Sequence, residues 1–221
     1  MFNSTEFVIL YGPPGSGKST LATELYPNYT TINVDDILAH TQEFIAAAAT
    51  ITAMITEGID RTQIEKQATY IYQSFRDAAD RKSEILLHRA ITAHNNIVFE
   101  ITGGSESAIS YLEKIITLIK AQGYWIKLIF PHTPVSLMQS RVYTRGLSTG
   151  RLPSRDLIAS SYAYACDHFH FIRGLCNEVA VADSTVTPTI YIYHCYGDRC
   201  ILHDRDRLAK LPLNLTCGLF E

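Results

Sequence analysis

The feature that most limits the possible folds is a glycine-rich loop between an apolar run and a helix-forming run. The apolar run is FVILY (Phe7 to Tyr11), residues 12–19 read GPPGSGKS, and STLATELY continues from the final serine. The loop fits the pattern G-x-x-x-x-G-K-[ST] at every position. Glycines let consecutive backbone N–H groups turn inward around an anion, and the following helix adds the positive end of its dipole. The pattern therefore predicts a strand, a loop that binds phosphates, and a helix.

The same loop supplies the candidate residues for binding a nucleotide and its metal ion. Lys18 is placed to reach the β- and γ-phosphates of ATP, and the Ser19 hydroxyl is placed to ligate Mg²⁺. The alternative is an ordinary Gly/Pro-rich turn with an incidental lysine. The complete motif, with a strand before it and a helix after it, favours nucleotide binding. We expect ATP to contact Gly12, Pro13, Pro14, Gly15, Ser16, Gly17, Lys18, Ser19 and Thr20.

Short β-branched or aromatic runs recur along the chain, separated by helical stretches. Continuous apolar runs of this kind are typical of strands buried on both faces of a parallel sheet, and their alternation with helices is the βαβ pattern. We therefore expect an α/β fold with a doubly wound, mainly parallel five-stranded sheet. The predicted strands are FVILY (7–11), TTINV (30–34), NIVFE (96–100), WIKLIF (125–130) and TIYIYHC (189–195).

The rest of the chain fits a single predicted domain over residues 1–221. Residues 37–94 are interpreted as a helical insertion, because the alanine-rich EFIAAAATITAMI is followed by Asp60, which opens a long helix towards Arg89. Thr133, followed by proline, predicts the N-cap of a further helix.

Composition and charge exclude some classes of protein. With 47% hydrophobic and 19% charged residues, the chain is typical of a globular protein rather than a disordered one. The net charge of −3 provides no general basic field for a long nucleic acid, although a local basic groove stays open. The N-terminal apolar run lacks a basic segment and stops at Gly12, so we expect no secretory signal and no membrane span.

The cysteines are odd in number and lack zinc-ligand spacing. Cys195 and Cys200 flank a turn predicted at Gly197 to Arg199, which joins the last strand to CILHD as an edge hairpin. This pair could form a disulfide in an oxidising compartment, but we expect free thiols in the cytoplasm. The full set is Cys166, Cys176, Cys195, Cys200 and Cys217.

Acidic side chains follow the second strand and end the third. Asp35 and Asp36 come after the second strand, and Glu100 ends the third. Because the carboxyl ends of parallel strands line the ligand crevice of an open sheet, these acids should face the phosphate loop. Asp35 is the candidate to orient or deprotonate an acceptor hydroxyl, whereas Asp36 fits the cap of a helix that begins at Ile37. Glu100 and the nearby Thr102 are candidates for binding the acceptor, with Mg²⁺ binding through water as the alternative for Glu100.

An arginine-rich segment, SRVYTRGLSTGRLPSRD, predicts a lid over residues 141–155. Arg141 and Arg145 share one face of a predicted helix, GLSTG follows as a mobile loop, and Arg151 lies beyond it. Phosphoryl transfer spreads negative charge over the oxygens in flight, and arginines of a closing lid stabilise that charge. Arg141 and Arg151 are therefore the candidate catalytic cations. The alternative is a solvated, arginine-rich helix end.

Four blocks together resemble the zeta-toxin group of P-loop kinases: GPPGSGKST, INVDDIL, FEITGG and RVYTRGLSTGRLP. The resemblance implies a nucleotide-kinase-like P-loop NTPase fold with strand order 2-3-1-4-5. It also implies ATP-dependent phosphorylation of a sugar hydroxyl, which in bacterial members is that of UDP-N-acetylglucosamine. In this chain it implies Asp35 as the base, Glu100 and Thr102 beside the acceptor, and Arg141 and Arg151 in the lid. An antitoxin-like inhibitor is the protein partner that it implies.

Two positions depart from this group, since Leu38 and Gly104 stand where basic residues are usual. The main alternative is a polynucleotide 5′-hydroxyl kinase, because NVDDIL and TRGLSTGRLPSRDLIASSY resemble that group nearly as well. Only under this alternative is nucleic acid a partner. A second alternative is a non-catalytic, ATP-binding regulatory protein, against which intact Lys18, Ser19 and Asp35 argue. We expect a kinase that uses ATP and Mg²⁺ to phosphorylate a hydroxyl of a small molecule.

Overall fold

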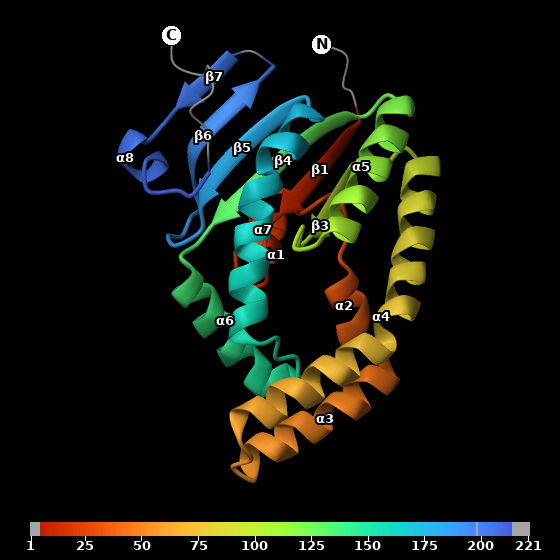
Figure 1. The fold of residues 1–221 in the computed structure, drawn as a ribbon. Coiled ribbons are helices and arrows are strands. Elements are labelled where there is room, and N and C mark those ends of the chain that lie inside the picture. The colour runs from red at the N-terminus through yellow and green to blue at the C-terminus, as the bar shows by residue number, and fades with distance from the viewer. Residues whose placement is uncertain (1–4, 198, 214–221) are drawn as a thin grey trace.

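A single sheet forms the centre of the molecule in the computed structural model, which describes residues 5–197 and 199–213 (Figure 1). Its strands are β1 Glu6–Tyr11, β2 Thr30–Ile32, β3 Ile97–Ile101, β4 Trp125–His132, β5 Glu178–Asp183, β6 Ile190–Tyr196 and β7 Arg199–Leu202. They lie in the order β2-β3-β1-β4-β5-β6-β7. The pairings from β2 to β5 are parallel, and those of β5 with β6 and of β6 with β7 are antiparallel.

Helices connect the parallel strands and form an extension at one end of the sheet. They are α1 Lys18–Leu25, α2 Val34–Ala39, α3 Gln42–Thr56, α4 Arg61–Thr92, α5 Glu106–Ala121, α6 Val135–Thr149, α7 Arg155–Gly174 and α8 Arg205–Leu208. Within the described ranges, none of these helices combines the length and the apolar character that a membrane span requires.

The predicted α/β fold with parallel order 2-3-1-4-5 is confirmed, but the predicted identity of the fifth strand is wrong. The fifth parallel strand is β5, EVAVAD, which is buried along its whole length. The predicted strand 189–195 forms the antiparallel β6, so the described sheet has seven strands rather than five. Four small apolar residues between two acids give a weak strand signal. The burial that stabilises this strand comes from β4 and β6 on either side of it.

The side chains of β1 alternate between two layers of the core, as the pleat of a strand requires. Phe7, Ile9 and Tyr11 belong to the larger cluster, which is built with α5, α7 and the end of α4. Val8 and Leu10 belong to the smaller cluster with α1 on the opposite face. Figure 1 shows α5 and α7 on the same side of the sheet. The sheet is therefore covered on both faces, and its carboxyl edge is left for the loops that carry the site.

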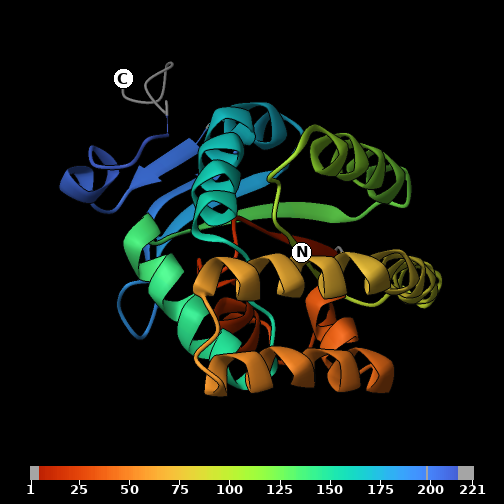
Figure 2. The ribbon, with the colours of Figure 1, turned by 60° about the horizontal axis from the view of Figure 1, so that its bottom comes forward.

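The helices α2, α3 and the first half of α4 form an extension with an apolar cluster of its own. Figures 1 and 2 show α3 running beside the first half of α4, below the carboxyl ends of the parallel strands. The long helix predicted from Asp60 is α4, and the Asp60 carboxylate caps it by accepting a hydrogen bond from the Thr62 amide at 2.9 Å. The second half of α4 then returns to the sheet, so this helix connects the extension to the main core.

Helix α6 begins and ends at residues other than those predicted. Its N-cap is Pro134 rather than Thr133, whose hydroxyl contacts the phosphate loop instead. The predicted mobile loop GLSTG is the last turn of this helix. The turn is held because Gly146 packs so closely on Leu152 that a Cβ atom there would lie 2.5 Å from Leu152 Cδ1. Gly150 then ends the helix in the left-handed conformation.

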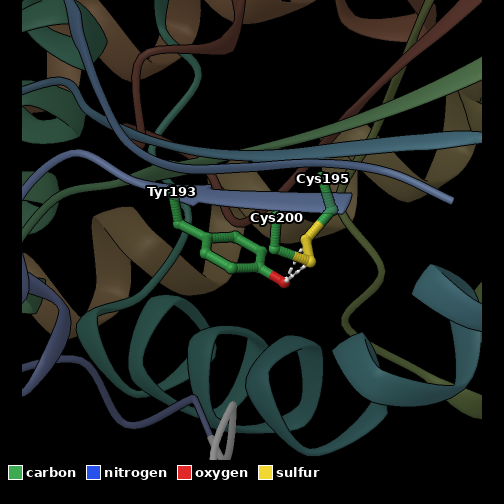
Figure 3. The surroundings of a disulfide bond; sticks show 3 residues. All are labelled: Tyr193, Cys195 and Cys200. Atoms are coloured by element: carbon green, nitrogen blue, oxygen red, sulfur yellow. Dashed lines mark hydrogen bonds between the residues drawn. A yellow bond between two sulfur atoms is a disulfide. The ribbon is translucent and has the colours of Figure 1, made fainter. Parts of the chain in front are cut away.

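Cys195 and Cys200 form a disulfide across the β6–β7 hairpin, which corrects the expectation of free thiols at these positions (Figure 3). The two residues are directly opposite each other in the antiparallel ladder, where facing side chains are close neighbours. The Tyr193 hydroxyl lies against both sulfur atoms and donates to Cys200 Sγ at 3.2 Å. The free thiols of the described chain are Cys166 and Cys176. Two residues of the sequence predictions lie outside the described ranges: Asp198 and Cys217.

Candidate functional site

The phosphate loop between β1 and α1 forms a tight backbone cradle. Gly17 caps α1 with φ of 102°, and a Cβ atom there would lie 2.8 Å from Ser184 Cβ, so the position requires glycine. Lys18 folds back over the loop. Its ammonium donates to the backbone carbonyls of Gly12 at 2.6 Å and Pro13 at 2.9 Å. In this structure the two backbone carbonyl oxygens therefore occupy the Lys18 ammonium, which would bind phosphate oxygens in a complex with a nucleotide.

Two buried hydroxyl groups, Ser16 Oγ within the loop and Ser184 Oγ beside it, have no hydrogen-bond partner within the described residues. An unpaired buried hydroxyl costs on the order of 1–3 kcal/mol, so such groups gather where a ligand or water completes them. Together with the ammonium of Lys18, these groups fit a polyphosphate bound in the loop.

Arg141 fixes the loop from the side of α6. Its guanidinium donates to the Ser184 carbonyl at 2.7 Å, to Thr133 Oγ1 at 3.3 Å and to the Gly15 carbonyl at 3.4 Å. Thr133 in turn donates to the Ser16 carbonyl at 3.1 Å. The arginine therefore joins α6, the loop and the segment after β5, and its side chain also lines the cavity over the loop.

Asp35 lies in the first turn of α2 and is the centre of a polar cluster. Arg151 Nη2 lies 2.5 Å from one of its carboxylate oxygens, and the Tyr72 hydroxyl donates to the other at 3.1 Å. Arg76 donates to that hydroxyl and pairs with Asp80 at 2.8 Å. Burial opposes the ionisation of Asp35, but the Arg151 guanidinium, the Lys18 ammonium and the Tyr72 hydrogen bond together outweigh it and lower the pKa of this carboxyl. Asp35 is therefore an ionised carboxylate with a fixed orientation.

The start of α2 differs from the prediction, in which Asp36 caps a helix beginning at Ile37. The helix begins at Val34, and its cap is Asn33, whose side-chain oxygen accepts from the Asp35 amide at 2.9 Å. Asp36 lies inside the first turn, beyond the position from which a side chain can cap the helix. The earlier start brings Asp35 onto a helix, which fixes its direction.

Glu100 lies at the end of β3 and is only 8% exposed. Its Oε2 accepts a hydrogen bond from the Ser19 hydroxyl at 3.0 Å. Burial raises the pKa of Glu100, while the Lys18 ammonium and the Ser19 hydrogen bond oppose that shift. Hydroxyl and carboxylate oxygens are ligands that Mg²⁺ prefers, so Ser19 and Glu100 fit a magnesium site beside the loop.

Burial also governs the charge of Lys18, because it lowers the pKa of this side chain to about 8. The carboxylates of Glu100 and Asp35 act in the opposite direction, and the Arg151 guanidinium adds to the lowering. An anion beside the ammonium favours its charged form. The free protein thus holds a lysine whose protonation is sensitive to what the loop binds.

Two cavities meet at the carboxylates of Asp35 and Glu100. The first, of about 300 Å³, lies over the phosphate loop and is lined by Lys18 and Ser19. The second, of about 620 Å³, lies between α4, α5 and α7 and is lined by Thr102 and Arg151. The residues common to both walls are Pro14, Asn33, Asp35 and Glu100. The arrangement can hold two ligands side by side, with two carboxylates between them.

The structure thus brings together the candidate residues that the sequence singles out, and it adds side chains that the sequence analysis missed. Arg145, predicted on the same helix face as Arg141, lines the first cavity with it. Tyr72 and Arg76 were missed, although a signal exists, since Tyr72, Arg76 and Asp80 recur at intervals of four on one helix face. Ser184 was also missed, because it follows β5, the strand that the sequence analysis did not find.

Packing explains both departures from the zeta-toxin pattern. Leu38 is 1% exposed and belongs to the apolar cluster of the helical extension. A Cβ atom at Gly104 would lie 2.6 Å from Ser161 Oγ, so α7 occupies the space into which a longer side chain would extend. Neither position offers a cation to a ligand.

Comparisons with known proteins place this architecture. No curated protein matches the sequence. Among solved structures, the complex of AvrRxo1-ORF1 with AvrRxo1-ORF2 and sulphate ions aligns with a TM-score of 0.65 at 13% identity, over 95% of this chain and 64% of that chain. The same complex with ATP gives a TM-score of 0.64 at 10% identity, over 99% of this chain and 66% of that one. The chain thus spans 64% of the length of the first of these proteins.

A third solved structure belongs to the PezAT chromosomal toxin-antitoxin system of Streptococcus pneumoniae. It aligns with a TM-score of 0.58 at 15% identity, over 86% of this chain and 72% of that chain. These likenesses concern the fold and confirm the resemblance to zeta-toxin-like P-loop kinases at that level. A family model described as an AAA domain matches residues 7–160, which is more than half of the sequence. The chain belongs to this AAA-domain family, and its fold is that of a zeta-toxin-like P-loop kinase.

Proposed function

We propose that the protein is a kinase that transfers the γ-phosphate of ATP to a hydroxyl of a small molecule. The observation that carries this proposal is the wall shared by the two cavities, where Asp35 and Glu100 stand. One cavity lies over the phosphate loop, and the other is large enough for a second ligand. A protein that only binds ATP needs no oriented carboxylate facing a second cavity. The similarity in fold to a complex solved with ATP supports the choice of nucleotide.

In this proposal the loop amides and Lys18 bind the phosphates. The Lys18 ammonium exchanges the carbonyls of Gly12 and Pro13 for phosphate oxygens. Ser19 and Glu100 hold Mg²⁺, which neutralises negative charge on the phosphates when it is bound. Arg141 keeps the loop in place through its hydrogen bond to the Gly15 carbonyl.

Asp35 then acts on the acceptor. The acceptor oxygen forms a bond to the γ-phosphorus, the bond from that phosphorus to the β–γ bridging oxygen breaks, and ADP leaves with the electron pair. The acceptor proton passes to the Asp35 carboxylate, which Tyr72 holds in position at 3.1 Å. Arg151, beside Asp35 at 2.5 Å, faces the charge that develops on the transferred oxygens.

The proposal is tested by incubating the protein with γ-labelled ATP, Mg²⁺ and a panel of hydroxyl acceptors. The panel contains free sugars, nucleosides, UDP-N-acetylglucosamine and a 5′-hydroxyl oligonucleotide. We expect label on a small-molecule acceptor with the wild type, and none with Lys18→Ala. Label on the oligonucleotide alone would favour the alternative function, that of a polynucleotide 5′-hydroxyl kinase. ATP binding without transfer to any member would support the regulatory protein instead.

We also propose an inhibitory protein partner of the antitoxin type. The support is that the solved neighbours are a complex of two proteins and a toxin-antitoxin system. Inducing the wild-type chain alone in a bacterial host should arrest growth, whereas Lys18→Ala should not. Equal growth of the two strains at equal protein levels would contradict a toxic kinase and, with it, the need for such a partner.

A further inference from the structure

The walls of the second cavity show what kind of molecule it suits. One part is apolar and aromatic and comes from α4, β3, α5, the segment between α6 and α7, and the start of α7; its residues are Tyr72, Phe99, Tyr111, Leu152 and Leu157. The Phe99 and Tyr111 rings lie 6.5 Å apart. Hydroxyl groups of serines and threonines from α4, α5, α7 and the segment after β3 also line the cavity. Such a surface suits a compact body, such as a sugar or nucleoside ring, that carries hydroxyl groups.

The charges of this cavity are unbalanced. Four carboxylates line it, and among the described lining residues only two cations oppose them, Arg76 and Arg151. Both cations already have partners, since Arg76 pairs with Asp80 at 2.8 Å and Arg151 with Asp35 at 2.5 Å. The remaining carboxylates are Glu84 and Glu100. The described wall therefore offers no unpaired cation to a phosphate or carboxylate group of a ligand.

Two further features work against an anionic ligand. The cavity adjoins the phosphate loop through Asp35 and Glu100, so ATP in that loop, which stays negatively charged overall even with one Mg²⁺ bound, would add negative charge beside it. At Gly104 a side chain of any length meets Ser161, with a Cβ atom at 2.6 Å from its Oγ, so no basic residue fits at that point of the wall.

We propose that this cavity binds an uncharged or cationic hydroxyl compound and rejects phosphorylated ones. The class includes free sugars, amino sugars and nucleosides, and it excludes nucleotide-sugars and the phosphate-flanked ends of nucleic acids. The term acceptor for this ligand rests on the proposed kinase function. The selection by charge rests on the cavity itself.

The test measures binding by saturation-transfer NMR with the full chain and with ADP saturating the phosphate loop. The probes are matched sets on one scaffold: N-acetylglucosamine, glucosamine and N-acetylglucosamine 1-phosphate, then uridine, 5′-amino-5′-deoxyuridine and UMP. We expect a neutral or amino member to bind at least about tenfold more tightly than its phosphorylated counterpart. Tighter binding of the phosphorylated members, or no binding by any neutral or amino member, overturns the proposal.

Variants locate the binding and its charge dependence. Ala108→Trp fills the cavity from α5 and should abolish binding, whereas Ser110→Trp on the exposed side of the same helix should not. Glu84→Gln should weaken the amino members about 2- to 5-fold and leave the neutral members unchanged. Glu113→Gln, an exposed glutamate of α5 outside the cavity, should change neither. Identical effects of the two glutamate variants would remove the electrostatic basis of the selection.

This readout does not depend on phosphate transfer. A chain that binds the neutral members and transfers no phosphate contradicts the proposed kinase and leaves the charge selection standing. A chain that phosphorylates UDP-N-acetylglucosamine in preference to N-acetylglucosamine supports the kinase and overturns the charge selection.

Discussion

Two buried glutamates occupy opposite ends of the central sheet, and they have opposite electrostatic situations. Glu178, at the start of β5, is 5% exposed and is contacted by Lys127 at 2.5 Å, His194 at 2.7 Å and Trp125 at 3.2 Å. Glu100, at the end of β3, is 8% exposed and accepts from Ser19. Burial disfavours ionisation in both, yet the Lys127 and His194 contacts lower the pKa of Glu178, whereas the pKa of Glu100 is raised.

The difference separates a carboxylate that stabilises the fold from one that is available to a ligand. Glu178 lines neither cavity, and its partners satisfy its charge. Glu100 lines both cavities and remains short of positive charge. Burial alone therefore does not mark a functional acid. A buried acid that faces a cavity with too few partners does.

Asp35→Asn is the strongest test of the end of the sheet that faces the two cavities. The substitution keeps the shape of the side chain and removes its ability to take up the acceptor proton, so we expect turnover to fall by about 10²- to 10⁴-fold. ATP binding should stay within about twofold, because Lys18 and the loop amides are unchanged. Steady-state kinetics and calorimetric titration with ATP measure the two quantities. Lost ATP binding, or near-normal turnover, would contradict this division of roles.

Glu100→Gln should lower turnover by roughly 10- to 100-fold, through a weakened magnesium site beside Ser19. Stability should not fall. Because the folded protein raises the pKa of Glu100, its ionised form destabilises the fold once the pH exceeds the pKa of the unfolded chain, and glutamine removes that cost. Activity against Mg²⁺ concentration and urea unfolding at pH 7 check the two statements. A variant that unfolds more readily at unchanged kcat would show that Glu100, like Glu178, stabilises the fold and does not serve catalysis.

ATP affinity should depend on pH through Lys18. Burial lowers the pKa of its ammonium to about 8 in the free protein, so above that pH ATP binding must also take up a proton. We expect affinity to fall by up to about tenfold per pH unit above 8. Calorimetry in two buffers with different heats of ionisation measures the proton uptake. Lys18→Arg is the matched control, because guanidinium stays charged in this range and the dependence should vanish. Constant wild-type affinity between pH 7 and 9 would refute the assignment.

Tyr72→Phe should reduce kcat by about 3- to 10-fold with little change in ATP affinity. The variant removes the 3.1 Å hydrogen bond that orients Asp35, whose loss amounts to about 1 kcal/mol. The acid limb of the kcat profile should move to higher pH, because that bond helps to lower the pKa of Asp35. Tyr70→Phe, on the exposed side of the same helix, is the control. An unchanged pH profile would leave Tyr72 with a packing role only.

Glu178→Gln should leave kcat unchanged and give the smallest effect on catalysis. It should instead lower the free energy of unfolding at pH 7 by on the order of 3 kcal/mol, since Lys127 loses its buried partner. The folded state lowers the pKa of Glu178, so this stability is present above the pKa of the unfolded chain and is lost as the pH falls through the folded value. Urea unfolding from pH 3 to 7 should show the two proteins converging in acid. A fall in kcat without a loss of stability would end the distinction between the two sheet ends.

Local patterns in the sequence predicted the parts of the fold that depend on neighbouring residues. The phosphate loop, the long helix capped by Asp60 and the hairpin of β6 and β7 are all specified by contiguous segments. The predictions failed where long-range packing decides the outcome. β5 is stabilised by strands on both sides, and GLSTG stays helical because Gly146 packs on Leu152.

The sequence by itself predicted the phosphate loop of this protein and its place between a strand and a helix. A loop of glycines followed by Lys18 and Ser19 has one main use, and its geometry arises within a few residues. Only the tertiary structure decided which acidic side chain pairs with which basic one. Asp35, Tyr72 and Arg151 come from three distant segments that the helical extension brings together. The second cavity and its charge exist only once these segments have packed together. Coulomb interactions and excluded volume depend on distances in space, not on positions along the chain.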